Sequence, residues 1–274
     1  MTESIKSKSE VIVIIPHYNN FKGLLRSIES IIEFIQIDVL IIDDGSKSNL
    51  IDESILNKIK PANVNIHIIY NDRNRGIERV LNDALKYIRN KPNNYKFVAR
   101  LDCGDLNAEN RFKTQMDYLK SHRKVGIVGS YVTFIDLKGE FVYNLKLPKN
   151  HTSIIRNIYI NSMFIHPTIM LRRDVLDVVQ NYPTKYTAAE DYAFFFEILK
   201  SFEGANIPEY LVLCEVNPNG ISISKRNQQI KSRILIILKN FKFGFYPTYG
   251  LVRSLLLLIV PYRIILFIKK QTLK

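Results

Sequence analysis

Residues 11–46 read VIVIIPHYNNFKGLLRSIESIIEFIQIDVLIIDDGS, and this stretch decides the fold class. It begins with the apolar run Val11–Ile15, which is typical of a strand buried on both faces. Apolar residues then recur at helical spacing from Leu24 to Ile35, and a second apolar run, Val39–Ile42, follows. The order strand, helix, strand predicts two parallel strands joined by a crossover helix.

The same alternation continues through the first half of the chain. It predicts further helices over Leu50–Ile59 and Ile77–Ile88, and further strands over Val64–Tyr70 and Lys96–Leu101. We therefore expect an α/β fold in which a mostly parallel sheet is flanked by helices. Ligands of such sheets bind beyond the carboxyl ends of the strands, so the residues that follow each strand are the first candidates for a site.

Beyond Leu101 the pattern is less regular. It predicts helices over Glu109–Lys120 and Glu190–Lys200, strands around Val125–Ile135 and Phe141–Tyr143, and an extended segment over His166–Leu171. A domain boundary is expected at the turn-rich stretch Asn217–Gly220, where the composition changes.

Composition bounds the class of protein. The 274 residues are 46% apolar and 24% charged, the balance of a folded chain. Two cysteines, Cys103 and Cys214, cannot form a disulfide framework, so a reducing compartment is expected. Met1–Glu10 is polar and the first apolar run is too short for a signal peptide, which predicts a cytosolic protein.

The net charge of +13 is concentrated in the C-terminal tail. Glu215 is the last acidic residue, and eleven basic residues follow it, so the tail carries +11 and residues 1–215 carry +2. Arg253 and Arg263 bracket only nine uncharged residues, too few for a membrane span. The tail is predicted to form amphipathic helices on an anionic lipid surface, with part of its apolar face packed on the protein's own core.

The turns after the first two strands carry polar residues. Pro16–Asn19 lacks the glycine-rich turn of a dinucleotide site, which disfavours an NAD enzyme. Asp43 and Asp44, followed by Gly45, can accept hydrogen bonds from a base or a ribose. By themselves they are also consistent with an ordinary polar turn that caps a helix.

Two further acidic pairs have the same two interpretations. Asp102 and Asp105 can hold a divalent ion that bridges phosphates, or can cap a turn. Glu190 and Asp191 open a helix, where the helix dipole favours acids, and either could act as a general base. Acidic turns from separate strands, together with Arg75, meet at one sheet edge and favour a nucleotide diphosphate with a metal.

The combined motifs resemble those of family 2 glycosyltransferases, in particular the bacterial members that build capsule, O-antigen or lipooligosaccharide. The matching segments occur in the family's order: Pro16-x-Tyr-Asn19, Asp43-Asp-Gly-Ser46, Asn74-Arg-Gly-Ile77, Arg100-Leu-Asp102, His166-Pro-Thr168 and Glu190-Asp-Tyr192. The resemblance extends from Val11 to about Ser224. It implies the GT-A fold and an inverting transfer from a nucleotide-activated sugar, with UDP-sugar expected.

The resemblance also implies roles for individual residues. The nucleoside pocket would be lined by Pro16, Tyr18 and one or both of Asp43 and Asp44, with Arg75 near the base or the phosphates. Asp102 would lie beside the ribose and, with Asp105, at the metal on the diphosphate. Asp191 would take the proton from the acceptor hydroxyl, while His166 and Glu190 would lie on the acceptor side.

One residue departs from the family's pattern. Gly104 stands where the second aspartate of an Asp-x-Asp-Asp motif is expected, and glycine has no side chain to ligate a metal. Mg²⁺ or Mn²⁺ is still the expected cofactor, because a divalent cation stabilises a departing diphosphate.

The predicted organisation is a GT-A catalytic domain over residues 1–220 followed by a membrane-associating tail over residues 221–274. Within the domain, residues 10–106 would bind the nucleotide sugar and residues 107–220 the acceptor, a glycan or lipid-linked saccharide. The protein would lie on the cytoplasmic face of the inner membrane and bind no nucleic acid. A sugar nucleotidyltransferase is an alternative, although its glycine-rich loop is missing after the first strand. A basic nucleic-acid-binding protein is another, although the body is almost neutral.

Overall fold

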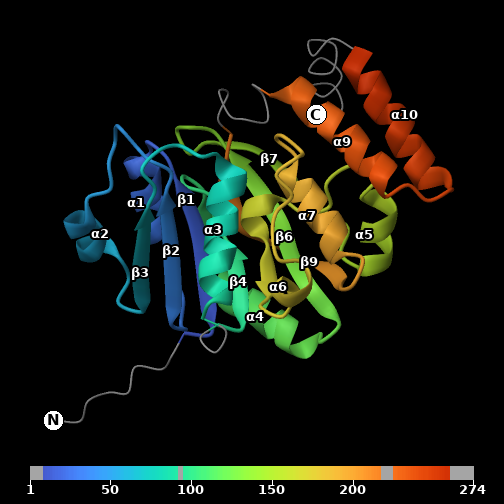
Figure 1. Cartoon of the computed structure of the whole chain (residues 1–274). Coiled ribbons are helices and arrows are strands. Elements are labelled where there is room, and N and C mark those ends of the chain that lie inside the picture. Colours follow the sequence, from blue (N-terminus) through green and yellow to red (C-terminus); the bar gives the residue numbers. More distant parts are fainter. Residues whose placement is uncertain (1–8, 92–94, 217–224, 260–274) are drawn as a thin grey trace.

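The computed structural model describes residues 9–91, 95–216 and 225–259. Within these ranges nine strands form one sheet in the order β3-β2-β1-β4-β8-β6-β9-β5, with β7 paired to β6 (Figure 1). The strands are β1 (Val11–His17), β2 (Ile37–Asp43), β3 (Val64–Tyr70), β4 (Phe97–Arg100), β5 (Leu106–Asn107), β6 (Val125–Ile135), β7 (Phe141–Leu145), β8 (Met170–Arg172) and β9 (Glu203–Glu215). The helices are α1 (Phe21–Glu29), α2 (Glu53–Ile59), α3 (Ile77–Arg89), α4 (Arg111–Ser121), α5 (His151–Asn157), the 3-10 turn η1 (His166–Thr168), α6 (Val175–Val178), α7 (Glu190–Ile198), α9 (Arg226–Lys239) and α10 (Phe245–Ile259).

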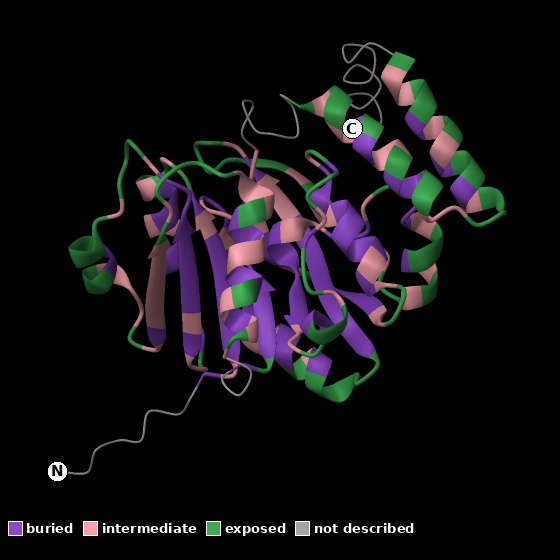
Figure 2. Cartoon of the chain, viewed as in Figure 1, coloured by how far each residue is buried: buried purple, intermediate pink, exposed green. Residues whose placement is uncertain are grey.

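The predicted parallel sheet is confirmed for the first half of the chain. Strands β1 to β4 pair in parallel, and Val11 lies opposite both Ile37 and Phe97. Ile12 and Ile14 belong to the apolar core that also contains side chains of α3 and α7, whereas Val13 belongs to the core with side chains of α1 and α4. Because alternate side chains point to opposite faces, a strand covered on both sides is apolar at every position. Figure 2 shows the buried strands behind helices whose outer faces are exposed.

The second half adds strands of both directions. β8 runs antiparallel to β4 and to β6, whereas β6 and β9 are parallel. Strand β9 was not predicted, because Pro208 and the polar residues Asn206 and Glu209 interrupt its apolar residues. The pairing with β6 steps from Ile207 to Tyr210, so Pro208 lies in an irregularity of the ladder. A proline fits a strand at such a bulge, where its missing N–H is not needed.

Two predicted elements differ from the structure. Helix α1 ends at Glu29, although the apolar periodicity continues to Ile35. The side-chain amide of Asn63 donates to the carbonyls of Glu33 and Ile35, which holds this stretch in a non-helical conformation. The expected extended segment over His166–Leu171 begins instead with the 3-10 turn η1.

Helices α9 and α10 lie against α5 and α7 (Figure 1). Ile236 and Ile237 of α9 are buried in the same core as α7. α10 packs so closely that a Cβ atom at Gly250 would lie 2.1 Å from the carbonyl oxygen of Tyr159. One face of these helices therefore belongs to the body of the protein. In the part of the chain that the structure describes, no helix is long and apolar enough to cross a bilayer.

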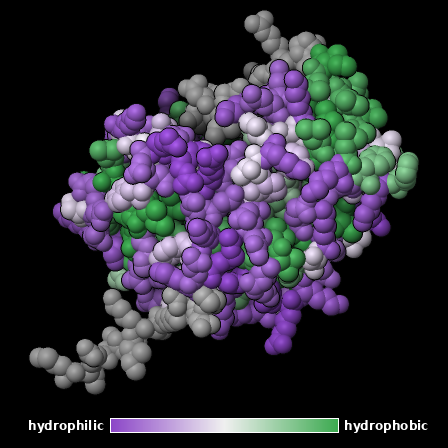
Figure 3. Space-filling model, in the orientation of Figure 1, coloured by the Kyte–Doolittle hydropathy of each residue, from purple (hydrophilic) through white to green (hydrophobic). Residues whose placement is uncertain are grey.

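The opposite face of α9 and α10 is apolar and exposed, and we call it the apolar face. In Figure 3 hydrophobic residues gather over α10, at the upper right. The exposed members are Leu235, Leu238, Phe243, Phe245, Tyr249, Val252, Leu255, Leu256 and Ile259. The boundary expected at residues 217–220 lies outside the described residues, as does the tail beyond residue 259.

Candidate active site

A cleft of about 520 Å³ opens at the carboxyl ends of β1, β2 and β4. Its walls are completed by the first turns of α3, α7 and α9. The lining residues are Pro16, His17, Tyr18, Asp44, Asn74, Gly76, Ile77, Glu78, Val80, Arg100, Asp102, Cys103, His166, Ala188, Glu190, Asp191, Lys225 and Gln229. The edge that parallel topology selects therefore holds a cavity rich in carboxylates.

Asp43 lies below the cleft and does not line it. Its carboxylate accepts hydrogen bonds from Nδ1 of His17 at 2.6 Å and from Oγ of Ser46 at 2.5 Å. Nε2 of His17 in turn accepts the backbone N–H of Asn20 at 3.2 Å, which fixes the tautomer of the imidazole. The two polar turns are thus held together by Asp43, and of the pair Asp43 and Asp44 it is Asp44 that lines the cleft.

Asp44 lines the cleft and anchors a third loop. Its two carboxylate oxygens accept the backbone N–H groups of Arg75 and Gly76, each at 2.9 Å. Gly76 has a φ of +89°, which permits the sharp entry into α3. The Arg75 side chain pairs with Asp83 at 2.7 Å. It is not among the residues that line the cleft, where the sequence had predicted it.

Arg100, the last residue of β4, forms the floor. Its side chain is 3% exposed and pairs with Asp102, whose own side chain is 44% exposed. Nε and Nη1 of Arg100 have no hydrogen-bond partner among the described residues. Arg111, fully buried, donates to the carbonyls of Arg100 at 2.8 Å and Pro167 at 2.6 Å, which ties β4 to η1. The buried Arg100 therefore holds Asp102 in place, and the exposed part of the Asp102 carboxylate faces the cleft.

Asp105 is buried and does not line the cleft. Its carboxylate accepts the backbone N–H of Glu215 at 2.8 Å, and burial followed by the nearby Asp102 charge raises its pKa. A Cβ atom at Gly104 would lie 3.6 Å from the Glu215 carboxylate, which pairs with Arg26 at 2.8 Å. In this structure Asp105 holds the turn to β9, and its role as a metal ligand stays a prediction.

These positions decide how a divalent cation could bind. Among the described residues no three His, Cys, Asp or Glu side chains are grouped to hold an ion. Asp102 lines the cleft with a carboxylate whose side chain is 44% exposed. One carboxylate suits an ion that is also ligated by substrate phosphates and water, which is a common arrangement for Mg²⁺. The residues fit a metal that arrives with the donor.

Glu190 and Asp191 form the wall opposite Asp102, in the first turn of α7. Burial is the main cause that raises the pKa of Asp191 to about 6, and Asp102 raises it further. Burial and then the charge of Asp191 also raise the pKa of Glu190, one of whose oxygens has no partner among the described residues. A carboxylate with a raised pKa, ionised at neutral pH, is suited to act as a general base.

His166 lines the cleft beside this pair. Its Nε2 lies 2.9 Å from the hydroxyl of Tyr182. Burial and then the nearby Arg100 lower the pKa of His166, so the imidazole is neutral at neutral pH. Pro16 and Tyr18 also line the cleft, as predicted, and the Tyr18 side chain is exposed at its rim.

Some lining residues were not predicted as site residues. Arg100 belongs to the quoted Arg100-Leu-Asp102 motif, and its position two residues before Asp102 is the signal that could have identified it. Lys225 and Gln229 had no such signal, because they reach the cleft only through the packing of α9 on α7.

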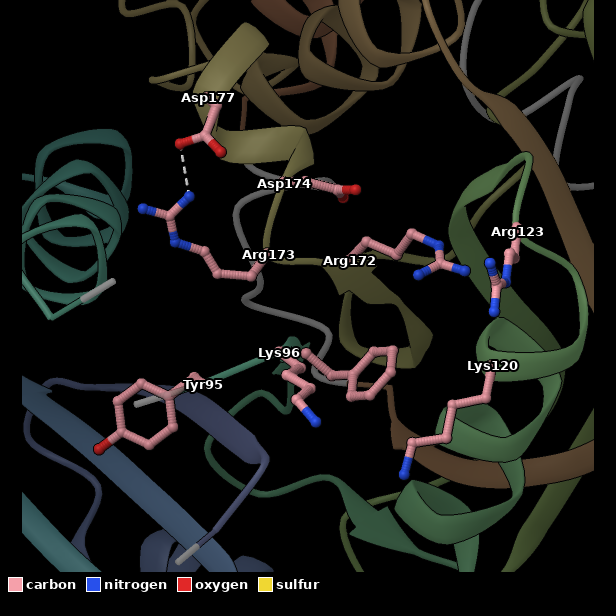
Figure 4. Close-up of a pocket in the computed structure, with 9 residues that line it drawn as sticks. Tyr95, Lys96, Lys120, Arg123, Arg172, Arg173, Asp174 and Asp177 are labelled. Carbon is pink, nitrogen blue, oxygen red and sulfur yellow. Dashed lines mark hydrogen bonds and ion pairs between the residues drawn. The ribbon is translucent and has the colours of Figure 1, made fainter. Parts of the chain in front are cut away.

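A second hollow of about 800 Å³ lies at the opposite edge of the sheet, around the start of β4 (Figure 4). Its residues are Tyr95, Lys96, Phe97, Lys120, Arg123, Arg172, Arg173, Asp174 and Asp177. Arg173 pairs with Asp177 at 2.5 Å, while Arg172 donates to the carbonyls of Leu119 and Val125. Arg172 and Arg173 are thus engaged in contacts within the protein. None of the carboxylates that line the cleft lines this second hollow.

Several known proteins have sequences similar to this chain. A relative in Erwinia amylovora, the amylovoran biosynthesis glycosyltransferase AmsE, is 26% identical over 211 residues, which cover 74% of this chain and 76% of AmsE. The Dictyostelium discoideum bifunctional glycosyltransferase pgtA is 24% identical over 77% of this chain, and the match spans only 31% of pgtA. An Escherichia coli UDP-Gal:alpha-D-GlcNAc-diphosphoundecaprenol beta-1,3-galactosyltransferase is 26% identical over 64% of this chain and 61% of its own length.

Solved structures share the fold. S. aureus TarS 1–349 in complex with UDP matches with a TM-score of 0.61 and 18% identity, over 90% of this chain and 70% of that one. The mannosyltransferase PcManGT from Pyrobaculum calidifontis, in complex with GDP-Man and Mn²⁺, matches with a TM-score of 0.62 and 15% identity, over 91% and 70%. The predicted GT-A fold is confirmed. The sequence pattern described as "Glycosyl transferase family 2" matches residues 12–179, more than half of the chain, which therefore belongs to this family of glycosyltransferases.

Proposed function

We propose that the protein transfers a sugar from a nucleotide-sugar donor, a UDP-sugar, to a glycan or lipid-linked acceptor in bacterial surface polysaccharide synthesis, with inversion at the anomeric carbon. The observation that carries the proposal is that Asp44, Asp102 and Asp191, from three separate segments, line one cleft. The match to a galactosyltransferase whose name specifies a UDP-linked donor and a diphosphoundecaprenol acceptor supports the substrate classes.

The donor would lie across the carboxyl edge of the sheet. Pro16, Tyr18 and Asp44, which line the cleft, would contact the nucleoside, and Asp102 would face the ribose and the diphosphate. Mg²⁺ or Mn²⁺ would be held by Asp102 together with the phosphates, and would stabilise the charge of the departing diphosphate. Arg100, buried beneath Asp102, keeps that carboxylate oriented.

Asp191 would act as the general base. It accepts the proton of the acceptor hydroxyl while the hydroxyl oxygen forms a bond to the anomeric carbon. On the opposite face of the sugar the bond from that carbon to the phosphate oxygen breaks, and the nucleoside diphosphate leaves with the bonding electrons. Attack opposite the leaving group inverts the configuration, through an oxocarbenium-like transition state. Glu190 and the neutral His166 would lie on the acceptor side.

The apolar face would place the cleft at a membrane, on the cytoplasmic face of the inner membrane. Exposed leucines, such as Leu255 and Leu256, can enter the acyl boundary of a bilayer. Lys242 is exposed in the loop between α9 and α10, where it can pair with anionic headgroups. The enzyme would then lie at the surface of the bilayer that contains its lipid-linked acceptor.

A screen of nucleotide sugars tests the proposal. The full chain is incubated with UDP-, GDP-, ADP- and dTDP-sugars, with Mg²⁺, with Mn²⁺ or with a chelator, and release of the free nucleoside diphosphate is measured. We expect release from one class of UDP-sugar, dependent on the cation. Binding of no nucleotide sugar would refute the assignment, and formation of a nucleotide sugar from a sugar phosphate and a nucleoside triphosphate would indicate a nucleotidyltransferase instead.

A further inference from the structure

The first turn of α9 forms part of the cleft, although α9 lies in the basic tail. Lys225, the residue that precedes the helix, and Gln229, one turn later, both line the cleft with Asp102 and Asp191. Residues four apart lie on the same side of a helix, so both side chains are presented to the cavity together. The position of this turn is set by contacts further along α9: Oγ of Ser232 donates to the carbonyl of Thr187 at 2.9 Å.

The charges around the cleft make Lys225 distinctive. Five carboxylates are among the described lining residues, namely Asp44, Glu78, Asp102, Glu190 and Asp191, and the two strong bases are Arg100 and Lys225. Arg100 is buried under Asp102 and paired with it. Lys225 is exposed, and no described residue forms a hydrogen bond or an ion pair with its ammonium group. Among the described residues, Lys225 is thus a base without a partner in a cleft that has an excess of carboxylates.

A diphosphate group entering this cleft would meet mostly like charge. Phosphate oxygens are stabilised by charge-assisted hydrogen bonds, and an ammonium group offers three donors for them. The side-chain amide of Gln229 can add a neutral donor from the same helix face. A phosphate group is therefore the ligand chemistry that suits the pair.

We propose that Lys225, supported by Gln229, is a phosphate-binding residue of the cleft, which engages the diphosphate of a substrate. The inference rests on the proposed transferase function and goes beyond it, because it makes the first turn of the tail part of the substrate site. Two substrates could supply the group, the nucleotide donor or a lipid diphosphate acceptor. If the donor supplies it, the ammonium group also stabilises the charge that develops on the leaving phosphate.

The test compares Lys225→Met and Lys225→Arg with the wild-type chain by isothermal titration calorimetry. The probes are UDP, uridine and farnesyl diphosphate, so that nucleoside binding, donor phosphate binding and lipid diphosphate binding are separated. Lys231→Met is the matched control, since Lys231 is an exposed lysine of the same helix that does not line the cleft. We expect Lys225→Met to lower the affinity for UDP or for farnesyl diphosphate about 10- to 100-fold. This is the range that the loss of a charged hydrogen bond gives. Uridine binding should not change, and Lys225→Arg should recover most of the affinity.

The outcomes distinguish a donor diphosphate from an acceptor diphosphate. They also distinguish a failure of the role of Lys225 from a failure of the proposed transferase function. If Lys225→Met lowers the affinity for UDP only, Lys225 binds the diphosphate of the donor. If it lowers the affinity for farnesyl diphosphate only, Lys225 binds the diphosphate of the acceptor. Unchanged affinity for both, equal weakening of uridine, or an equal effect of Lys231→Met would overturn the role of Lys225. If the wild-type chain binds neither UDP nor uridine, the donor assignment of the proposed function has failed, whatever Lys225 does.

Discussion

The substitution Asp191→Asn tests the chemical core of the proposed mechanism. Asparagine has nearly the same shape, and its amide oxygen can still accept the backbone N–H of Tyr192, which lies 2.7 Å from Asp191 Oδ1. The fold and donor binding should therefore be preserved. The amide cannot take a proton at neutral pH, so a positioned base is lost. General bases contribute about 10²- to 10⁴-fold, which corresponds to roughly 2.7–5.5 kcal/mol of transition-state stabilisation.

The pH dependence gives the same prediction a second measurement. Burial disfavours the ionised carboxylate and raises the pKa of Asp191 to about 6. The base works only when it is deprotonated, so the activity of the wild-type enzyme should be full above this pKa and fall as the pH drops through 6. An ordinary exposed aspartate would keep the activity down to about pH 4. The acid-side loss belongs to Asp191 and should be absent from Asp191→Asn.

The assay measures product formation with the donor found in the nucleotide-sugar screen, between about pH 5 and 8, the range in which the loss from this raised pKa would be visible. UDP affinity is measured in parallel. Asp117→Asn is the control, because Asp117 is half-exposed on α4 and pairs with Lys113 there. Turnover of Asp191→Asn within a few-fold of the wild type, or an acid-side loss that persists in this variant, would remove Asp191 from the mechanism.

Three further predictions concern the metal, the tail and the membrane. Asp102→Asn should weaken donor binding at least about tenfold in Mg²⁺ or Mn²⁺ and should make the remaining affinity insensitive to a chelator in calorimetry; a wild-type response to the chelator would contradict this. Ile237→Ala should lower the free energy of unfolding, measured in urea, by about 2–5 kcal/mol because the side chain is buried. Leu238 is exposed on the same helix, so Leu238→Ala should lower it by at most about 0.5 kcal/mol. Equal losses in the two variants would indicate that α9 does not pack on the body. The pair Leu256→Asn and Ile259→Asn should reduce flotation with anionic vesicles without changing the urea midpoint, and undiminished flotation would exclude α10 from the membrane contact.

The parallel half of the fold was predictable because local sequence determines it. Strand β3 and helix α3 match their predicted positions closely, since apolar runs and helical periodicity report burial directly. β9 escaped prediction because the residues of β6 with which it pairs lie 77 to 80 positions earlier in the sequence, and because Pro208 conceals the strand pattern. Pairing between distant segments leaves little trace in either segment alone.

The candidate site was predictable to the level of the turn, and less so to the level of the side chain. Asp43 and Asp44 are adjacent, and successive side chains of extended backbone point to opposite sides, so only one of them can face the cleft. The sequence does not say which, and hydrogen bonds from His17 and Ser46 decide it. Lys225 could not be foreseen at all, because its place depends on how a helix of the tail packs on α7.

Helix α9 joins the cleft to the apolar face. Its 14 residues extend over roughly 21 Å, from the first turn at the cleft to Leu238 on the apolar face. Between these ends Ile236 and Ile237 are buried in the core, so the helix is held to the body along its length. A bilayer that contacts the apolar face would therefore lie at a fixed separation from the cleft. Under that geometry α9 would act as a spacer that sets how far a lipid-linked substrate must extend from the bilayer to reach Asp191.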